Sequence, residues 1–164
     1  MKRVSILLFF FVVLSSITQN KIPELNRKIT NYVHSVIGKQ VDRGECWDLA
    51  YQALTRNNAK WDKEFKYGKL LNPWKDNVFP GDLIQFKNVR ISYQRDQMVY
   101  IETMKQHTAI IYRVLGTGIY EIAHQNNIFS GKKVGLSKLD LNTIVKGKVF
   151  LYRPVPGECI NVDG

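Results

Sequence analysis

The chain has 164 residues, with 24 lysines and arginines against 14 aspartates and glutamates, three histidines and two cysteines. This length suits one domain, with or without a processed leader, and the near-average apolar content excludes a largely disordered, collagenous or coiled-coil chain. Two cysteines are too few for a disulfide-dense small domain, and with three histidines they leave little material for a zinc finger. The sequence therefore predicts no metal site and no cofactor.

The first 19 residues have the pattern of a secretory signal peptide. Lys2 and Arg3 precede an apolar run from Ile6 to Leu14, and small residues follow it. The run is shorter than the roughly 18–20 residues that span a bilayer. We therefore expect residues 1–19 to be removed, leaving a mature chain that is secreted or periplasmic and has no membrane span. An uncleaved membrane anchor is the alternative interpretation.

The formal net charge of +10 favours anionic partners such as cell-wall polymers, lipid headgroups or acidic glycans. The basic residues are scattered along the sequence, so a role in solubility alone explains them equally well. No recognised nucleic-acid-binding motif is present, and we expect no nucleic-acid partner. The sequence does not indicate an oligomeric state.

Two helices are expected near the start of the mature chain. Residues 22–37 carry apolar side chains three or four positions apart, and Gly38 follows the last of them. A second helical pattern runs from about Cys46 to Arg56. The turn residues Pro80-Gly81-Asp82 then mark a change to β-structure.

The strands expected after this turn are residues 83–86, 89–93, 98–103, 108–115, 119–123 and 148–152. Gly116-Thr117-Gly118 between two β-branched runs indicates a hairpin. Helices followed by strands predict an α+β fold, in which N-terminal helices pack on an antiparallel sheet. Residues 20–164 are expected to form a single domain with a short C-terminal tail.

A thiol and an imidazole are the candidate chemical groups. Cys46 lies at the start of the second helix, where unpaired N–H groups and the helix dipole favour a thiolate. His107 opens a predicted strand and is a candidate base, which needs a third polar group to orient it. If Gly116 and Thr117 form the hairpin loop, then His107 faces Asn126, and His124 shares their side of the sheet. A loop longer by one residue favours Gln125 instead.

Four ordered segments carry a family resemblance. They read GECWDLA at residues 44–50, PGDLIQF at 80–86, QHTAI at 106–110 and AHQN at 123–126. Together they resemble the CHAP and NlpC-like cysteine amidases and peptidases. The resemblance implies a papain-like fold with Cys46 as nucleophile, His107 as general base and Asn126 as the orienting residue. Many members have Glu where His124 stands and NlpC-like members often use a second His, so the choice between His124 and Asn126 stays open.

The resemblance further implies a secreted cysteine hydrolase, an amidase or endopeptidase, acting through a thioester on amide bonds. Peptidoglycan is the implied substrate, because bacterial members commonly cleave it, and another amide-containing polymer is possible. Two alternatives keep the same scaffold: an inactive module that binds cell wall or protein, and a thiol acyltransferase. A disulfide between Cys46 and Cys159 is a further alternative, because an exported chain with two cysteines invites pairing.

Overall fold

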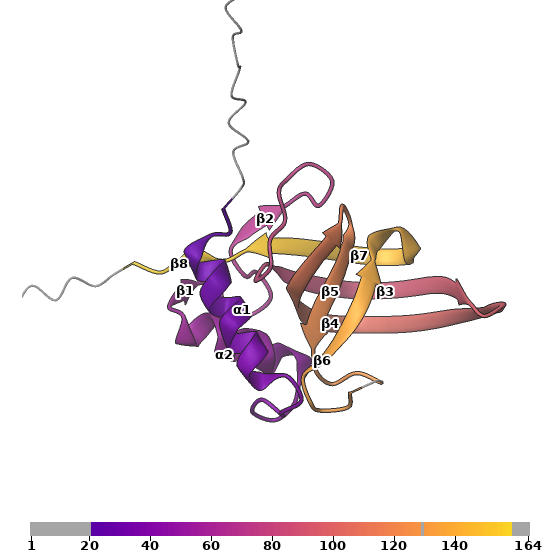
Figure 1. The fold of residues 1–164 in the computed structure, drawn as a ribbon, viewed down its shortest axis with the longest axis horizontal. Coiled ribbons are helices and arrows are strands. Elements are labelled where there is room, and N and C mark those ends of the chain that lie inside the picture. Colours follow the sequence, from indigo (N-terminus) through magenta and orange to yellow (C-terminus); the bar gives the residue numbers. More distant parts are fainter. Residues whose placement is uncertain (1–20, 129, 159–164) are drawn as a thin grey trace, which may run out of the picture.

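The computed structural model describes residues 21–128 and 130–158 (Figure 1). The predicted signal peptide and Cys159 lie outside these residues. In the described part of the chain, no helix combines the length and the apolar character needed to cross a membrane.

Two helices begin the fold, as predicted from the sequence. Helix α1 (Glu24–Val36) buries one stripe formed by Leu25, Ile29 and Val33, whose spacing places them on a single face. Helix α2 (Cys46–Arg56) begins with a capping box, in which the side chains of Glu45 and Asp48 each accept a hydrogen bond from the other's backbone N–H. The capping box fixes the first turn of α2, and therefore the position of Cys46.

A six-stranded antiparallel sheet follows, with the strand order β2-β7-β3-β4-β5-β6. Its strands are β2 (Lys69–Leu71), β3 (Leu83–Arg95), β4 (Met98–Gly116), β5 (Ile119–His124), β6 (Gly135–Asp140) and β7 (Ile144–Arg153). The short helix η1 (Leu141–Thr143) joins β6 to β7, and β1 (Ala59–Lys60) pairs with β8 (Val155–Pro156) in a separate two-stranded sheet. The predicted α+β class is confirmed.

The strand boundaries differ from the sequence prediction in the central hairpin. The predicted strands 83–86 and 89–93 are one strand, β3, and the predicted strands 98–103 and 108–115 are one strand, β4. Asn88 has a positive φ of 51° inside β3. The two strands nevertheless keep one register along their whole length, so cross-strand pairing continues through this local break. Strands β2 and β6 were not predicted.

The sheet has two differently covered faces. On the helix face, residues such as Leu83, Ile110 and Ala123 pack with α1 and α2 into one core (Figure 1). On the opposite face, Phe86 and Ala109 belong to a second core formed by strands and η1 without the helices. We call this second side the groove face.

The β3–β4 hairpin reaches beyond the rest of the sheet (Figure 1). Strand β5 pairs with β4 only between Ile110 and Gly116, and the pairing of β7 with β3 ends at Ile91. The outer part of the hairpin is therefore a two-stranded ribbon.

A buried carboxylate joins the beginning and the end of the described chain. Asp82 is fully buried, and its oxygens accept hydrogen bonds from Arg153 at 2.7 and 3.0 Å. Asn26 of α1 donates to the same carboxylate at 2.7 Å. The turn before β3 is thereby tied to α1 and to the last residue of β7.

Candidate active site

Cys46 is a free, half-buried thiol at the first residue of α2. Burial raises the pKa of this thiol, and hydrogen bonds from the backbone N–H groups of Thr108 and Trp47 oppose the rise only in part. The expectation of a thiolate stabilised by the helix start is therefore wrong for this state of the protein. Loss of hydration outweighs the helix terminus, and the thiol is protonated near neutral pH.

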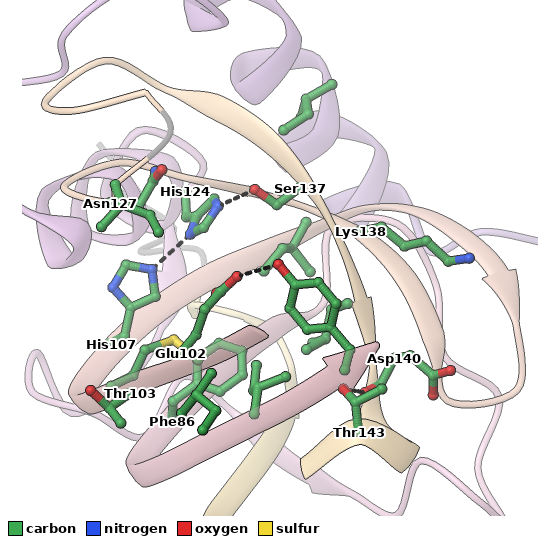
Figure 2. A pocket seen from close by; sticks show the side chains of 18 of the residues that line it. Phe86, Glu102, Thr103, His107, His124, Asn127, Ser137, Lys138, Asp140 and Thr143 are labelled. Atoms are coloured by element: carbon green, nitrogen blue, oxygen red, sulfur yellow. Dashed lines mark hydrogen bonds between the residues drawn. The ribbon is translucent and has the colours of Figure 1, made fainter. Parts of the chain in front are cut away.

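His107 and His124 form a buried pair on neighbouring strands. Nε2 of His107 lies 2.8 Å from Nδ1 of His124, and Nε2 of His124 lies 2.8 Å from Oγ of Ser137 (Figure 2). Only 6% of His107 and 7% of His124 is exposed. Ser137 was not foreseen, because its strand, β6, was not predicted.

Both imidazoles are neutral near pH 7. Burial lowers the pKa of His107 to about 4. Burial, with a further contribution from His107, lowers the pKa of His124 to about 3. In one of the two tautomer patterns, Nε2–H of His107 donates to His124, whose own Nε2–H donates to Ser137. That pattern leaves Nδ1 of His107 as an acceptor, and this atom has no hydrogen-bond partner among the described residues.

The Cys46 thiol of α2 lies beside β4 next to His107, without a direct bond between the two side chains. The Cys46 sulfur contacts the backbone N–H of Thr108, the residue that follows His107. The His107 ring lies beside Phe86, its cross-strand partner, on the groove face. In the described part of the chain, no hydrogen bond joins Cys46 to His107. The structure therefore places the predicted nucleophile beside the strand that carries the predicted base, with the imidazole on the groove face.

Of the two candidates for the third residue, His124 contacts His107 and Asn126 does not. Asn126 has a positive φ of 59°, and its Nδ2 donates to a carboxylate oxygen of Glu45 at 2.6 Å. It therefore contacts the residue that precedes the nucleophile.

The predicted register is observed next to the site, although the hairpin loop differs and the predicted pair of His107 with Asn126 is not formed. Ile110 pairs with Ala123 as expected, but the loop residues are Thr117 and Gly118. Register shifts at Tyr112 and Leu115 each add one residue to β4 and compensate for the different loop.

Gln125 connects β5 to the segment that leads into α2. Its Nε2 donates to the carbonyls of Val41 and Glu45 at 2.9 and 2.8 Å, and its Oε1 accepts from the backbone N–H of Val41 at 3.2 Å. The side chain is fully buried. This Gln125 clamp holds the Cys46 and His124 segments together.

A groove of about 880 Å³ opens over the histidine pair. Figure 2 shows His107, His124 and Ser137 along it, together with Phe86, Glu102 and Lys138. Cys46 is not among the residues that line this groove. The described residues contain no group of three or more His, Cys, Asp or Glu arranged to hold a metal ion.

Comparisons with known proteins place this geometry in context. The family model of the AIM3/BBC1 cysteine proteinase-fold domain matches residues 23–164. Altered inheritance of mitochondria protein 3 of Debaryomyces hansenii is 26% identical over 166 residues, which cover 84% of this chain and 18% of that protein. This chain thus corresponds to less than a fifth of its relative.

Two crystal structures of Ly7917 are similar at 13% identity. The first has a TM-score of 0.46, and the matched region covers 77% of this chain and 62% of the Ly7917 chain. The second, with the hydrolyzing product of MDP, has a TM-score of 0.44 and covers 79% and 63%.

Proposed function

The chain belongs to the AIM3/BBC1 cysteine proteinase-fold domain family, and we propose that it is a cysteine-dependent hydrolase that cleaves amide bonds. The finer assignment to a papain-like enzyme of the CHAP or NlpC-like type is part of this proposal. The supporting observation is the placement of the Cys46 thiol at a helix start, beside the segment of β4 that carries His107, the hydrogen-bond partner of His124.

The proposed mechanism uses the tautomer pattern described above. Nδ1 of His107 takes the proton from Cys46, and the sulfur attacks the amide carbonyl. The backbone N–H of Cys46, at the start of α2, stabilises the oxyanion. His107 returns the proton to the leaving amine, which leaves a thioester on Cys46. Water, deprotonated by His107, hydrolyses the thioester and restores the thiol.

His124 takes the orienting role in this mechanism. With its proton on Nε2, it presents a lone pair on Nδ1 to the Nε2–H of His107, as a carboxylate does in related triads. Ser137 accepts the Nε2–H of His124 and thereby holds the required tautomer. A neutral imidazole supplies less stabilisation to an imidazolium than a carboxylate, so we propose slower turnover than in an enzyme with an acidic third residue.

The proposal requires the thiol and the imidazole to come within hydrogen-bond distance when substrate binds. Catalytic hydrogen bonds are often long in unliganded enzymes and shorten in the substrate complex. The direct test compares wild-type protein with Cys46→Ser and His107→Gln on fluorescent peptide libraries. His34→Gln is the matched control, because His34 is an exposed histidine of α1 whose hydrogen-bond partner is the hydroxyl of Tyr112.

The expected result is cleavage by wild-type protein and by His34→Gln, and loss of cleavage in the other two variants. Equal turnover by Cys46→Ser or His107→Gln refutes the mechanism. Mass spectrometry of protein quenched during turnover should also detect the acyl group that the thioester places on Cys46.

An inactive binding module is the second candidate function. The raised pKa of the Cys46 thiol and the lack of a direct bond to His107 favour it. It predicts no cleavage by any of these proteins and unchanged ligand binding after Cys46→Ala.

Peptidoglycan as substrate and export as localisation are further proposals. Release of soluble muropeptides from purified wall, lost in Cys46→Ser, supports the first, and release confined to peptide substrates contradicts it. N-terminal sequencing of protein recovered outside the cell tests the second. We expect it to begin near residue 20, and an intact Met1 contradicts removal of the leader.

A further inference from the structure

The groove contains a carboxylate for which the described residues supply no cation. Glu102 of β4 is the cross-strand partner of Ile91, which belongs to the second core, so its side chain lies on the groove face (Figure 2). Glu102 is half-buried and forms no ion pair with another described residue. Its Oε1 accepts a hydrogen bond from the Tyr93 hydroxyl at 3.0 Å. Its Oε2 has no hydrogen-bond partner in the described part of the chain.

The charged groups nearby do not neutralise Glu102. The histidine pair is neutral near pH 7. Lys138 lies on the wall formed by β6, and Figure 2 shows its side chain extending away from the Glu102 carboxylate. Asp140 is a second acid of the groove, but its Oδ1 accepts two hydrogen bonds from Asn142 at the start of η1. A partly desolvated carboxylate is unfavourable without a partner, so the complement of Glu102 is a cation from outside the chain.

Aromatic and apolar side chains surround this carboxylate. Tyr93 and Tyr100 are cross-strand partners whose stacked rings have centroids 5.4 Å apart, and both share the groove face with Glu102. Met104 also lines the groove, two residues further along β4. A Lys or Arg side chain fits such a site, because its aliphatic stem packs on apolar groups while its charge reaches the carboxylate and the aromatic rings. A metal ion does not fit, since the described residues offer no group of three or more metal-ligating side chains.

The groove has the length and the apolar rim that a polypeptide needs. Its volume of about 880 Å³ exceeds that of one side chain. Ile128, which also lines it, is 82% exposed, and exposed apolar groups in a groove are typical of binding surfaces. Glu102 precedes His107 by five residues on β4, which is about 16 Å along an extended strand. A basic side chain bound at Glu102 therefore lies several residues from the bond presented to His107.

We propose that Glu102 determines substrate specificity: the groove binds a polypeptide segment whose Lys or Arg side chain pairs with the Glu102 carboxylate, several residues from the bond to be cleaved. The cation donates to the free Oε2, while the Tyr93 hydroxyl holds Oε1. This inference rests on the proposed hydrolase function for the fate of the bound segment. The binding itself needs no reaction at Cys46.

The binding test uses the full chain with Cys46→Ala, so that cleavage does not interfere. Labelled peptides of about ten residues, slightly longer than a typical strand, consist of Ser and Val with one Lys placed at each position in turn. A matched set carries norleucine, which keeps the aliphatic stem and lacks the ammonium. Fluorescence anisotropy should show at least one Lys peptide bound about tenfold more tightly than its norleucine counterpart, as expected for a hydrogen bond between charged groups.

Substitutions at Glu102 assign this preference to one side chain. Glu102→Gln keeps the shape and the acceptor for Tyr93, and it should reduce the affinity for the Lys peptide to that for the norleucine peptide. Glu102→Lys should reverse the preference, so that a Glu peptide binds more tightly than the Lys peptide. Glu24→Gln is the matched control, because Glu24 is an exposed carboxylate of α1, outside the groove. It should leave the preference unchanged, and circular dichroism should show all variants folded.

Cleavage separates this inference from the proposed function. With Cys46 intact, kcat/KM should favour the Lys peptide by the same factor, and Glu102→Gln should remove the difference. Cleavage without a Lys preference contradicts the role of Glu102 and leaves the hydrolase function standing. Lys-selective binding that Glu102→Gln abolishes, together with no cleavage in any peptide library, contradicts the hydrolase function and supports the role of Glu102.

Three binding results overturn the proposal. The first is equal binding of the Lys and norleucine sets, or no binding of either, because the groove then does not recognise the ammonium. The second is a Lys preference that survives Glu102→Gln. The third is an equal loss of preference in Glu24→Gln, because the effect then follows the overall charge of the protein.

Discussion

Acidification is expected to destabilise the fold through the buried pair of His107 and His124. In the unfolded chain each imidazole has its ordinary pKa of about 6.5 and takes up a proton as the pH falls below this value. In the folded protein the pKa values are about 4 and about 3, so both rings stay neutral. The unfolded state therefore binds more protons over this range, and the free energy of unfolding falls as the pH falls.

The size of the effect follows from these pKa values. Between about pH 7 and about pH 5, each histidine contributes a loss of about 2 kcal/mol, and the pair contributes about 4 kcal/mol. Because both folded pKa values lie below 5, the loss is set almost entirely by the unfolded chain. This is a large part of the stability of an ordinary domain.

The assay is urea unfolding at the two pH values. Wild-type protein and His34→Gln should show the full loss, and the double variant His107→Gln/His124→Gln should show a loss smaller by about 4 kcal/mol. Subtracting the double variant removes the contribution of carboxylates that begin to titrate near pH 5. The reasoning is refuted when wild-type protein and the double variant lose the same free energy.

Three further predictions concern single residues. Iodoacetamide should alkylate Cys46 more slowly near neutral pH than an exposed cysteine in a reference peptide, because burial raises the pKa of the Cys46 thiol. Site-resolved mass spectrometry measures both rates, and an equal or faster rate at Cys46 contradicts the assigned environment. Asp82→Ala should lower the free energy of unfolding by about 3–5 kcal/mol, because it leaves Arg153 without its buried partner. A loss below about 1 kcal/mol in urea unfolding contradicts a stabilising role of this ion pair. Gly147→Ala should lower the stability of the fold more than Gly38→Ala. Both glycines have a positive φ, but only at Gly147 does an added Cβ lie 2.3 Å from a backbone oxygen of β3. Equal losses of stability in thermal unfolding contradict the steric contribution.

The register of the β4–β5 hairpin shows how much of the site could be predicted from the sequence. Alternation and an assumed two-residue loop predicted a register that is observed for Ile110 and Ile111, while the predicted partners His107 and Asn126 lie beyond the paired part of the two strands. The loop itself is displaced by one residue, and the extra residues Tyr112 and Leu115 restore the offset. Alternation alone does not reveal such bulges, because they depend on how the strand twists against its neighbours.

Other features of the site depend on tertiary structure and left no local signal. Ser137 belongs to β6, in which only Leu139 is buried, so the strand lacks a buried alternating pattern. The raised pKa of Cys46 reflects desolvation by residues distant in sequence. The motif thus predicted the two candidates for the partner of His107, while the choice of His124 over Asn126 and the protonation states depend on the completed packing.

The Gln125 clamp has a mechanical consequence. One buried amide donates two hydrogen bonds and accepts a third, and so ties the segment before the thiol-bearing helix to the end of the His124 strand. We expect adjustment to an incoming molecule to come mainly from a wall of the groove that this clamp does not hold. That wall is the outer β3–β4 ribbon, which neither helix braces, and it is the part of the molecule whose bending would open or narrow the approach to the imidazoles.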